Sequence, residues 1–332
     1  MSALFQTFAR RRPEFSGAVV SEWSRIEHMW IDAMGEAWNL TDPSGSVFLR
    51  RAGVRGLGMP SHEPYVRTSP AIPGQRHVGS RVLPREAFWP LYLYSDEGSD
   101  AFANVDRAFW RGMHRDRHGL WRVKVGSQVR ELACRFAEAE DAYERDPVHF
   151  GSATYGVRLI ADDPFWYGEW VSRRFVNADG NATFFGSGGT PFTIGSSNTI
   201  DTSTIDNPGD EKSYLIYILN GPFTSASVGI GSANAVQTNY VGDVPEGKSV
   251  VVDTRPAARA TARLIDTPTA TVGAEDWDAQ VFGDPGVNVF ENLTHIALSS
   301  PLQAGENRQL HLALAGAGSV TVAHRPPYWR AW

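Results

Sequence analysis

Short runs in which apolar and polar residues alternate recur along much of the chain of 332 residues. An alternation with a period of two is typical of β-strands that bury one face. Gly and Pro, at 32 and 20 residues, divide the sequence into runs that are too short for most helices. The pattern therefore predicts a mostly β protein. The clearest expected strands are 121–125, 128–136, 155–160, 213–219, 248–254, 309–314 and 319–324.

One segment favours a helix, because an apolar residue recurs there at every third or fourth position. The recurring residues are Phe102, Val105, Phe109 and Met113. Asp100 stands before them and is expected to cap the helix N-terminus. The segment 22–40 also shows helical spacing, but Gly35 beside Glu36 favours a strand, a turn and a second strand.

The length and a change in composition predict two domains. A chain of this length suits two cores better than one. Residues 178–210, which follow Trp170 closely, are rich in Gly, Ser, Thr, Asn and Asp and poor in charge, as in the loops and exposed strands of a β domain. We therefore expect one domain over residues 1–170 and another over residues 171–332.

The segment 162–170, DDPFWYGEW, lies at this predicted boundary. The residue before a proline favours an extended backbone, so the Asp-Pro step is expected to end the preceding strand. We expect the first two aromatic residues to fill the core of the first domain and the later ones to lie along the seam between domains. The residues concerned are Asp163, Pro164, Phe165, Trp166, Tyr167 and Trp170.

The composition argues against several classes of function. A formal net charge of −6 at pH 7 offers no field that attracts nucleic acid. Cys134 is the single cysteine, so neither an intrachain disulfide nor a cysteine-based zinc site can form. The N-terminal residues have the wrong charge order for a secretory signal, and no apolar run approaches the roughly 18 residues that span a bilayer. We expect a protein made in the cytoplasm that does not enter a membrane.

Candidate catalytic and metal sites have simpler explanations. The sequence lacks nucleophile-elbow, phosphate-loop and zinc-protease motifs. His114 and His118 have the spacing of metal ligands on a helix, but the arginines around them favour a solvated helix end. Glu138 and Glu140, which precede Asp141, share one face of a strand and are expected to form a solvated edge. No enzymatic activity, cofactor or metal is expected.

The C-terminal sequence HRPPYWRAW carries three large aromatic residues, Tyr328, Trp329 and Trp332. This is too much apolar surface to remain in water. We expect the three rings to dock either on the chain's own body or on a neighbouring subunit.

Several passages, in this order, resemble the distal tail (Dit) proteins of siphoviruses, especially the versions in actinobacterial phages that are often called minor tail proteins. In the first half they are WIDAMGEAWNLTD, VFLRRAGVRGLGMP, SPAIPGQRHVGSRVLPREAFWPLYLY, GLWRVKVGSQVREL and VRLIADDPFWYG. In the second half they are NPGDEKSYLIYILNGPF, GKSVVVDTRP and LSSPLQAGENRQLHLAL. Residues 1–22 depart from the family.

The resemblance implies a first domain that is a β-sandwich or split barrel with one helix and a long hairpin, and a second domain that is a galectin-like β-sandwich. It also implies a ring of six copies in the virion tail tip, with a structural and non-enzymatic role. The implied partners are the chain itself, the major tail tube protein, the tail hub or tail-associated protein and the tape measure protein. DNA would pass through the ring without being recognised. The hairpin, expected at residues 67–95, would bridge subunits, with Pro84 and Pro90 suited to an extended arm.

A carbohydrate-binding module is the alternative function. Trp277 is the aromatic residue best placed to stack on a sugar, since Asp276 and Asp278 beside it can bond to hydroxyl groups. The simpler interpretation of Trp277 is a loop residue that packs on the second domain.

Overall fold

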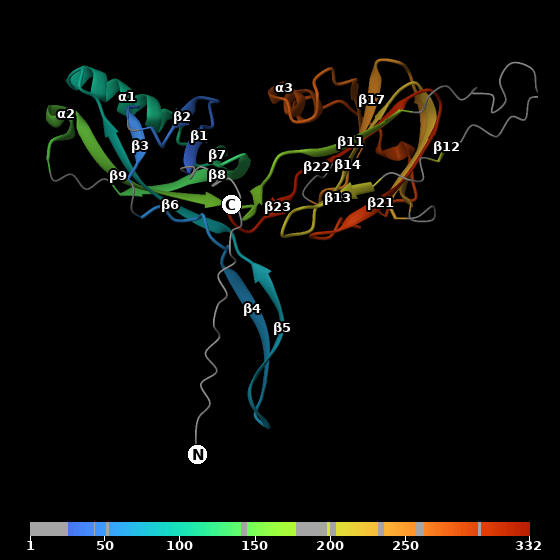
Figure 1. Cartoon of the computed structure of the whole chain (residues 1–332), viewed down its shortest axis with the longest axis horizontal. Helices are drawn as coiled ribbons and strands as arrows, with labels where there is room; N and C mark the ends of the chain where they lie inside the picture. The colour runs from blue at the N-terminus through green and yellow to red at the C-terminus, as the bar shows by residue number, and fades with distance from the viewer. Residues whose placement is uncertain are drawn as a thin grey trace, which may run out of the picture.

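The computed structural model in Figure 1 describes residues 26–42, 44–50, 53–140, 145–176, 198–199, 204–231, 236–256, 262–297 and 300–332. The segment 1–22, Asp141 and most of the Gly- and Ser-rich stretch 178–210 lie outside these residues. None of the described helices is long and apolar enough to cross a membrane.

The described chain is mostly β, as the alternation predicts. The first half contains β1 (Glu27–Ile31), β2 (Ala37–Asn39), β3 (Val47–Leu49), β4 (His62–Ser69), β5 (Ile72–Val82), β6 (Arg85–Tyr94), α1 (Ser99–Gly112), β7 (Gly119–Val125), β8 (Gln128–Glu140), α2 (Pro147–Phe150), β9 (Ser152–Ala161) and β10 (Trp166–Tyr167). The second half contains β11 (Val171–Val176), β12 (Asn198–Thr199), β13 (Thr204–Asp206), β14 (Ile216–Asn220), β15 (Phe223–Ile230), β16 (Val236–Val244), β17 (Lys248–Asp253), β18 (Ala262–Asp266), α3 (Glu275–Asp278), η1 (Ala279–Gly283), β19 (Val287–Asn288), η2 (Phe290–Asn292), β20 (Leu293–Thr294), β21 (Asn307–Ala315), β22 (Ser319–His324) and β23 (Pro327–Tyr328).

The strands of the first half form a split barrel. Their order is β2-β1-β7-β8-β9-β6-β3, and β10 and β23 add to the sheet beside β8. The two ends of this sheet approach each other, because Leu49 in β3 donates its backbone N–H to the carbonyl of Leu40, just after β2, at 2.8 Å. The curved sheet thus encloses a core, and α1 lies over it (Figure 1).

The helix and the strand-turn-strand segment form where the sequence placed them. Gly35 lies in the turn between β1 and β2 with a φ of +89°, a conformation that glycine adopts without strain. In α1 the expected stripe includes Phe102 and Phe109, which are buried. The cap was predicted wrongly: the N-cap is Gly98, which has no side chain to accept a bond, and Asp100 lies in the first turn, where its charge favours the helix dipole.

The projecting hairpin differs from the predicted segment 67–95. It consists of β4 and β5, which pair from His62 with Val82 to the tip, whereas β6 belongs to the barrel and buries alternate residues. Pro90 therefore lies inside a paired strand. The Pro90 carbonyl accepts from the backbone N–H of Arg50, just past the end of β3, at 2.7 Å. Because the nitrogen and the carbonyl of a strand residue point to the same side, the N–H that Pro90 lacks would also have faced this side and not β9. The short neighbour β3 is what lets a proline occupy this strand.

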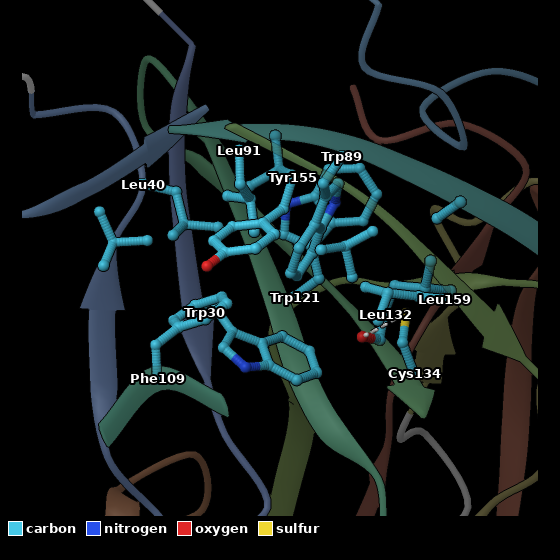
Figure 2. Packing of buried hydrophobic residues seen from close by; sticks show 14 of the residues in the cluster. Trp30, Leu40, Trp89, Leu91, Phe109, Trp121, Leu132, Cys134, Tyr155 and Leu159 are labelled. Atoms are coloured by element: carbon cyan, nitrogen blue, oxygen red, sulfur yellow. Dashed lines mark hydrogen bonds between the residues drawn. The ribbon is translucent and has the colours of Figure 1, made fainter. Parts of the chain in front are cut away.

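A row of buried tryptophans runs through the barrel core (Figure 2). Trp30 packs against Trp89, and Trp89 against Trp121, with ring centroids 5.1 and 5.2 Å apart. Trp166 extends the row, since its ring centroid lies 5.1 Å from that of Trp121. The four rings come from β1, β6, β7 and β10 and are at most 2% exposed, so they join strands that are far apart in the sequence.

The second half forms a β-sandwich. One sheet has the order β11-β22-β14-β17-β18-β19, the other β12-β21-β15-β16-β20, with β13 paired to β21. In β14, Tyr217 and Leu219 face the core between the sheets, while Ile216 and Ile218 face a second cluster around Trp277 of α3. Burial of both faces explains why this strand is a continuous apolar run.

The last residues of the chain return to the barrel. Strand β23 pairs with β10, and Ala331 joins the barrel core and donates its N–H to Leu57 O at 3.0 Å. The ring of Tyr328 lies under the guanidinium of Arg130, whereas Trp329 and Trp332 keep 37% and 38% of their surface exposed. The division predicted at Trp170 therefore does not describe these last residues.

Trp166→Ala is expected to lower the free energy of unfolding by about 3–5 kcal/mol, because it removes the end of the tryptophan row and leaves a cavity. Urea unfolding measures this change. Trp329→Ala, which removes a partly exposed ring, is the control and should cost much less. Equal midpoints for the two variants would contradict the role assigned to Trp166.

Candidate functional site

The hairpin of β4 and β5, which we call the arm, is the most exposed part of the described chain. It projects away from both the barrel and the sandwich (Figure 1). All eight residues of β4 are exposed, and the arm carries exposed apolar side chains, including Tyr65, Val66 and Val78. An isolated two-stranded hairpin is only marginally stable in water, and its outer edges present unpaired backbone groups. Such an arm suits contact with another protein.

Arg85 fastens the base of the arm to the barrel. It is 3% exposed and lies directly after the arm, at the start of β6. Its guanidinium donates to the carbonyl oxygens of Pro164 at 2.7 Å, Gly56 at 2.8 Å and Trp329 at 2.7 Å, and also to that of Gly58. Burial lowers the pKa of Arg85 to about 10, so it keeps its charge at neutral pH. One side chain thus joins the arm base to three separate segments.

The loop under Arg85 can approach only because of a glycine. Gly56 has a φ of +102°, and a Cβ there would lie 2.8 Å from the Cβ of Ala87. The same Gly56 carbonyl also accepts from the Trp166 indole at 3.3 Å. The tryptophan row and the Arg85 contacts therefore meet at one backbone group.

An ion-pair network connects the barrel with the sandwich. Glu131 of β8, whose side chain is 13% exposed, contacts Arg122 of β7 at 2.6 Å and Arg325, just after β22, at 2.8 Å. Arg325 also donates to Gly168 O at 2.9 Å. Burial alone would raise the pKa of Glu131, but the two arginines outweigh it and hold that pKa below its ordinary value. The carboxylate thus stays charged between the two halves.

The segment 162–170 divides between the barrel and the junction. Trp166 is buried in the barrel core, but Phe165 is only half-buried and is absent from that core, contrary to the prediction that both would fill it. Consecutive residues of an extended chain point to opposite sides, so the two rings cannot share one core. Asp163 is exposed and accepts from Phe165 N at 3.3 Å and from the Tyr167 hydroxyl at 2.8 Å, which fixes the bend after Pro164.

Tyr167 and Trp170 lie beside Arg325, which sits 5.8 and 5.9 Å from their ring centroids. Trp170 also packs against Phe282, 6.0 Å away and nearly parallel. Tyr167 and Trp170 border a cavity of about 840 Å³ that Phe165, the arm base and the sandwich complete. Both residues are half-buried and line this cavity at the junction of barrel and sandwich.

Trp277 cannot stack on a sugar. It is 1% exposed and packs edge to face against Trp170, with ring centroids 4.8 Å apart. Asp276 and Asp278 are exposed beside it, but they flank a buried ring. The carbohydrate site predicted at these residues is therefore wrong, since the ring covers the outer face of a sandwich sheet.

The other sequence candidates form no metal or catalytic site. Within the described residues, no group of three or more His, Cys, Asp or Glu side chains could hold a metal ion. His118 contacts Asp162 at 3.1 Å, on the surface. Glu138 and Glu140 form the solvated edge that the sequence predicts, because β7 ends opposite Cys134 and this part of β8 pairs only with β9; both exposed side chains bind Arg158, at 2.8 and 3.0 Å.

Arg85, Glu131 and Arg325 were not among the predicted site residues. A signal existed for Arg85, since it occupies the same face of β6 as Ala87 and Trp89 and so falls at a core position. Nothing in the local sequence connects Glu131 with Arg325, 194 residues later.

Comparisons with solved structures identify similar folds. No protein-family model matches the sequence, and no curated protein sequence matches it significantly. The Dit (gp 19.1) protein of SPP1, described as a paradigm of the hub adsorption apparatus in Gram-positive infecting phages, gives a TM-score of 0.56 at 14% identity, over 92% of this chain and 99% of that chain. A chain of the phage P2 baseplate in its activated conformation, with Ca or with Sr, gives 0.54 at 11% identity, over 90% and 98%. The chain thus shares the fold of these proteins along nearly its whole length.

Arg85→Met is expected to lower the free energy of unfolding by about 3–5 kcal/mol, because it leaves buried carbonyl oxygens without a donor. Chemical denaturation measures the loss. Arg81→Met, which removes an exposed arginine of the arm, is the matched control and should change stability by less than about 0.5 kcal/mol. Wild-type stability of Arg85→Met would refute the fastening role.

The Glu131 network predicts a pH dependence. A carboxyl group whose pKa is lower in the folded state stabilises that state above its ordinary pKa of 4.5, and the contribution is lost as pH falls through the lowered value. Glu131→Gln should therefore cost about 1–3 kcal/mol at pH 7 and clearly less near pH 3. Thermal unfolding across this range tests it, with Glu97→Gln as control, since Glu97 is exposed and forms no ion pair within the described chain. A cost for Glu131→Gln that does not change with pH would contradict the network.

Proposed function

We propose that the protein is a structural component of a phage tail tip, a distal tail protein whose copies close a ring between the tail tube and the tail hub. The observation that carries the proposal is a long arm with both faces exposed, fastened at its base to a rigid barrel, on a chain that shares its fold with SPP1 Dit and a P2 baseplate protein. An arm of this kind has no role in a lone subunit, whereas a neighbouring subunit can cover it.

In this proposal the ring contains six copies, and the barrel lines its bore. The sandwich, which we propose to be galectin-like and to correspond to most of residues 171–332, lies outside the ring. The partners are the chain itself, the major tail tube protein, the tail hub or tail-associated protein and the tape measure protein, and DNA passes through without being recognised. The protein acts in the virion, in a phage of the actinobacterial type, and is not an enzyme.

A structural role agrees with the contacts that the buried charged residues make. Buried charged groups such as Arg85 and Glu131 fasten segments to each other rather than face a reactive cavity. Head-to-tail contact through an arm joins each subunit to the next, and such heterologous contacts close into rings.

Removal of the arm tests the proposal. Leu83 donates its N–H to Ser61 O at 2.9 Å, so the ends of residues 62–82 are adjacent and a short Asn-Gly turn can replace them. The shortened protein should unfold within a few degrees of the wild type, because the arm buries little surface. Sedimentation should show assembly for the full chain and monomers for the shortened one. Assembly of the shortened chain to the same extent would contradict the role of the arm.

A further inference from the structure

The charged residues of the arm gather on one of its faces. In the register of β4 and β5, Glu63 stands opposite Arg81 and Arg67 stands opposite Arg76. Directly opposed residues point to the same side, and alternate residues of a strand share that side. Tyr65 of β4 therefore lies on the same face. We call these five residues the arginine face.

Arg67 and Arg76 place two positive charges directly across from each other near the tip. Both are exposed, and neither forms an ion pair within the described residues. Like charges in this position destabilise a strand pair. A carboxylate from outside the subunit would relieve the repulsion, and the planar guanidinium groups suit paired contacts with carboxylates.

The arginine face is turned away from the subunit's own sandwich. Ser80 and Val82, which lie on the opposite face of the arm, border the cavity beside the sandwich. The arginine face is thus free to meet another molecule.

A groove of suitable charge lies on the outer surface of the barrel. It has a volume of about 540 Å³ and crosses β6, β8 and β9. Its carboxylates come from Glu86, Glu138 and Glu140, and its cations from Arg55 and Arg158. Arg158 binds two of the glutamates, Glu138 and Glu140, and its single charge offsets only one of them. The groove therefore keeps a net negative charge. The ring of Phe88 also borders the groove and offers an apolar surface to a tyrosine.

The charge balance favours a second copy of the chain as the partner. Residues 62–82 carry three arginines and one glutamate, a net charge of +2, so the rest of a chain whose total is −6 carries −8. A basic arm and an acidic body attract each other between copies. A phosphate polymer, by contrast, would meet this acidic body and only a few cations. The arm also has the reach, since the 11 residues of β5 span about 35 Å, close to the diameter of a domain of this size.

We infer that the arginine face of one subunit binds the groove between β6, β8 and β9 of the next, with Arg67 and Arg76 bound to Glu138 and Glu140 and Tyr65 packed near Phe88. The inference rests on the proposed self-assembly and names the surface that receives the arm.

Charge reversal tests this contact. Arg67→Glu with Arg76→Glu should lower the self-association constant of the full chain at least about tenfold, measured by sedimentation at low salt. Adding Glu138→Arg, Glu140→Arg and Arg158→Glu inverts the groove while keeping its internal ion pairs. This combined variant should recover most of the lost association, because opposite charges face each other again.

The control is Arg107→Glu with Arg111→Glu, two exposed arginines of α1, which makes the same change in net charge. It should associate like the wild type. Thermal unfolding of each variant confirms that it is folded. If the wild type assembles but arm reversal has no effect, or if the combined variant stays as weak as arm reversal alone, the arm does not bind this groove. A wild type that stays monomeric overturns the proposed ring itself.

Discussion

The buried guanidinium of Arg85 holds together parts of the molecule that the chain brings from four places. It is the first residue of β6, close after the arm, and bonds to the backbone of the 56–58 loop, the Asp-Pro step and the C-terminal segment. A buried cation without a carboxylate is tolerated only when carbonyl dipoles surround it, so these segments must stay in place around it. The tryptophan row ends at the same loop, because the Trp166 indole shares the Gly56 carbonyl. The direction of the arm is therefore set by the barrel core.

The second set of buried charges, Glu131 with Arg122 and Arg325, plays the same part between barrel and sandwich. The chain leaves the barrel at β10, builds the sandwich and returns as β23 to pair with β10. Because the return begins at Arg325, the ion pair and the strand pairing stabilise each other. A subunit built this way holds its arm and its sandwich in a fixed relation, as the proposed ring contacts require.

Sequence reasoning could predict the elements whose burial is one-sided. Strands β7, β8 and β9, the helix α1 and the turn at Gly35 all leave a periodic or conformational signal. The limits of the arm could not be predicted this way, because strands exposed on both faces have no apolar alternation. In the sequence, Pro84 and Pro90 indicate an extended arm, so the predicted hairpin wrongly included β6. Pro90 fits there only because β3 is short. Trp277 shows a similar limit. A tryptophan between two aspartates gives the same local sequence pattern whether its ring is exposed or buried. Here the ring packs against Trp170, which is distant in the sequence, and is buried.

The arm is proposed to join copies of the subunit into a ring. Electron microscopy of the purified chain of 332 residues can show whether it does. Closed rings with a central opening and the sandwiches at the rim are expected. A field of single two-lobed particles at micromolar concentration and low salt would contradict the proposal.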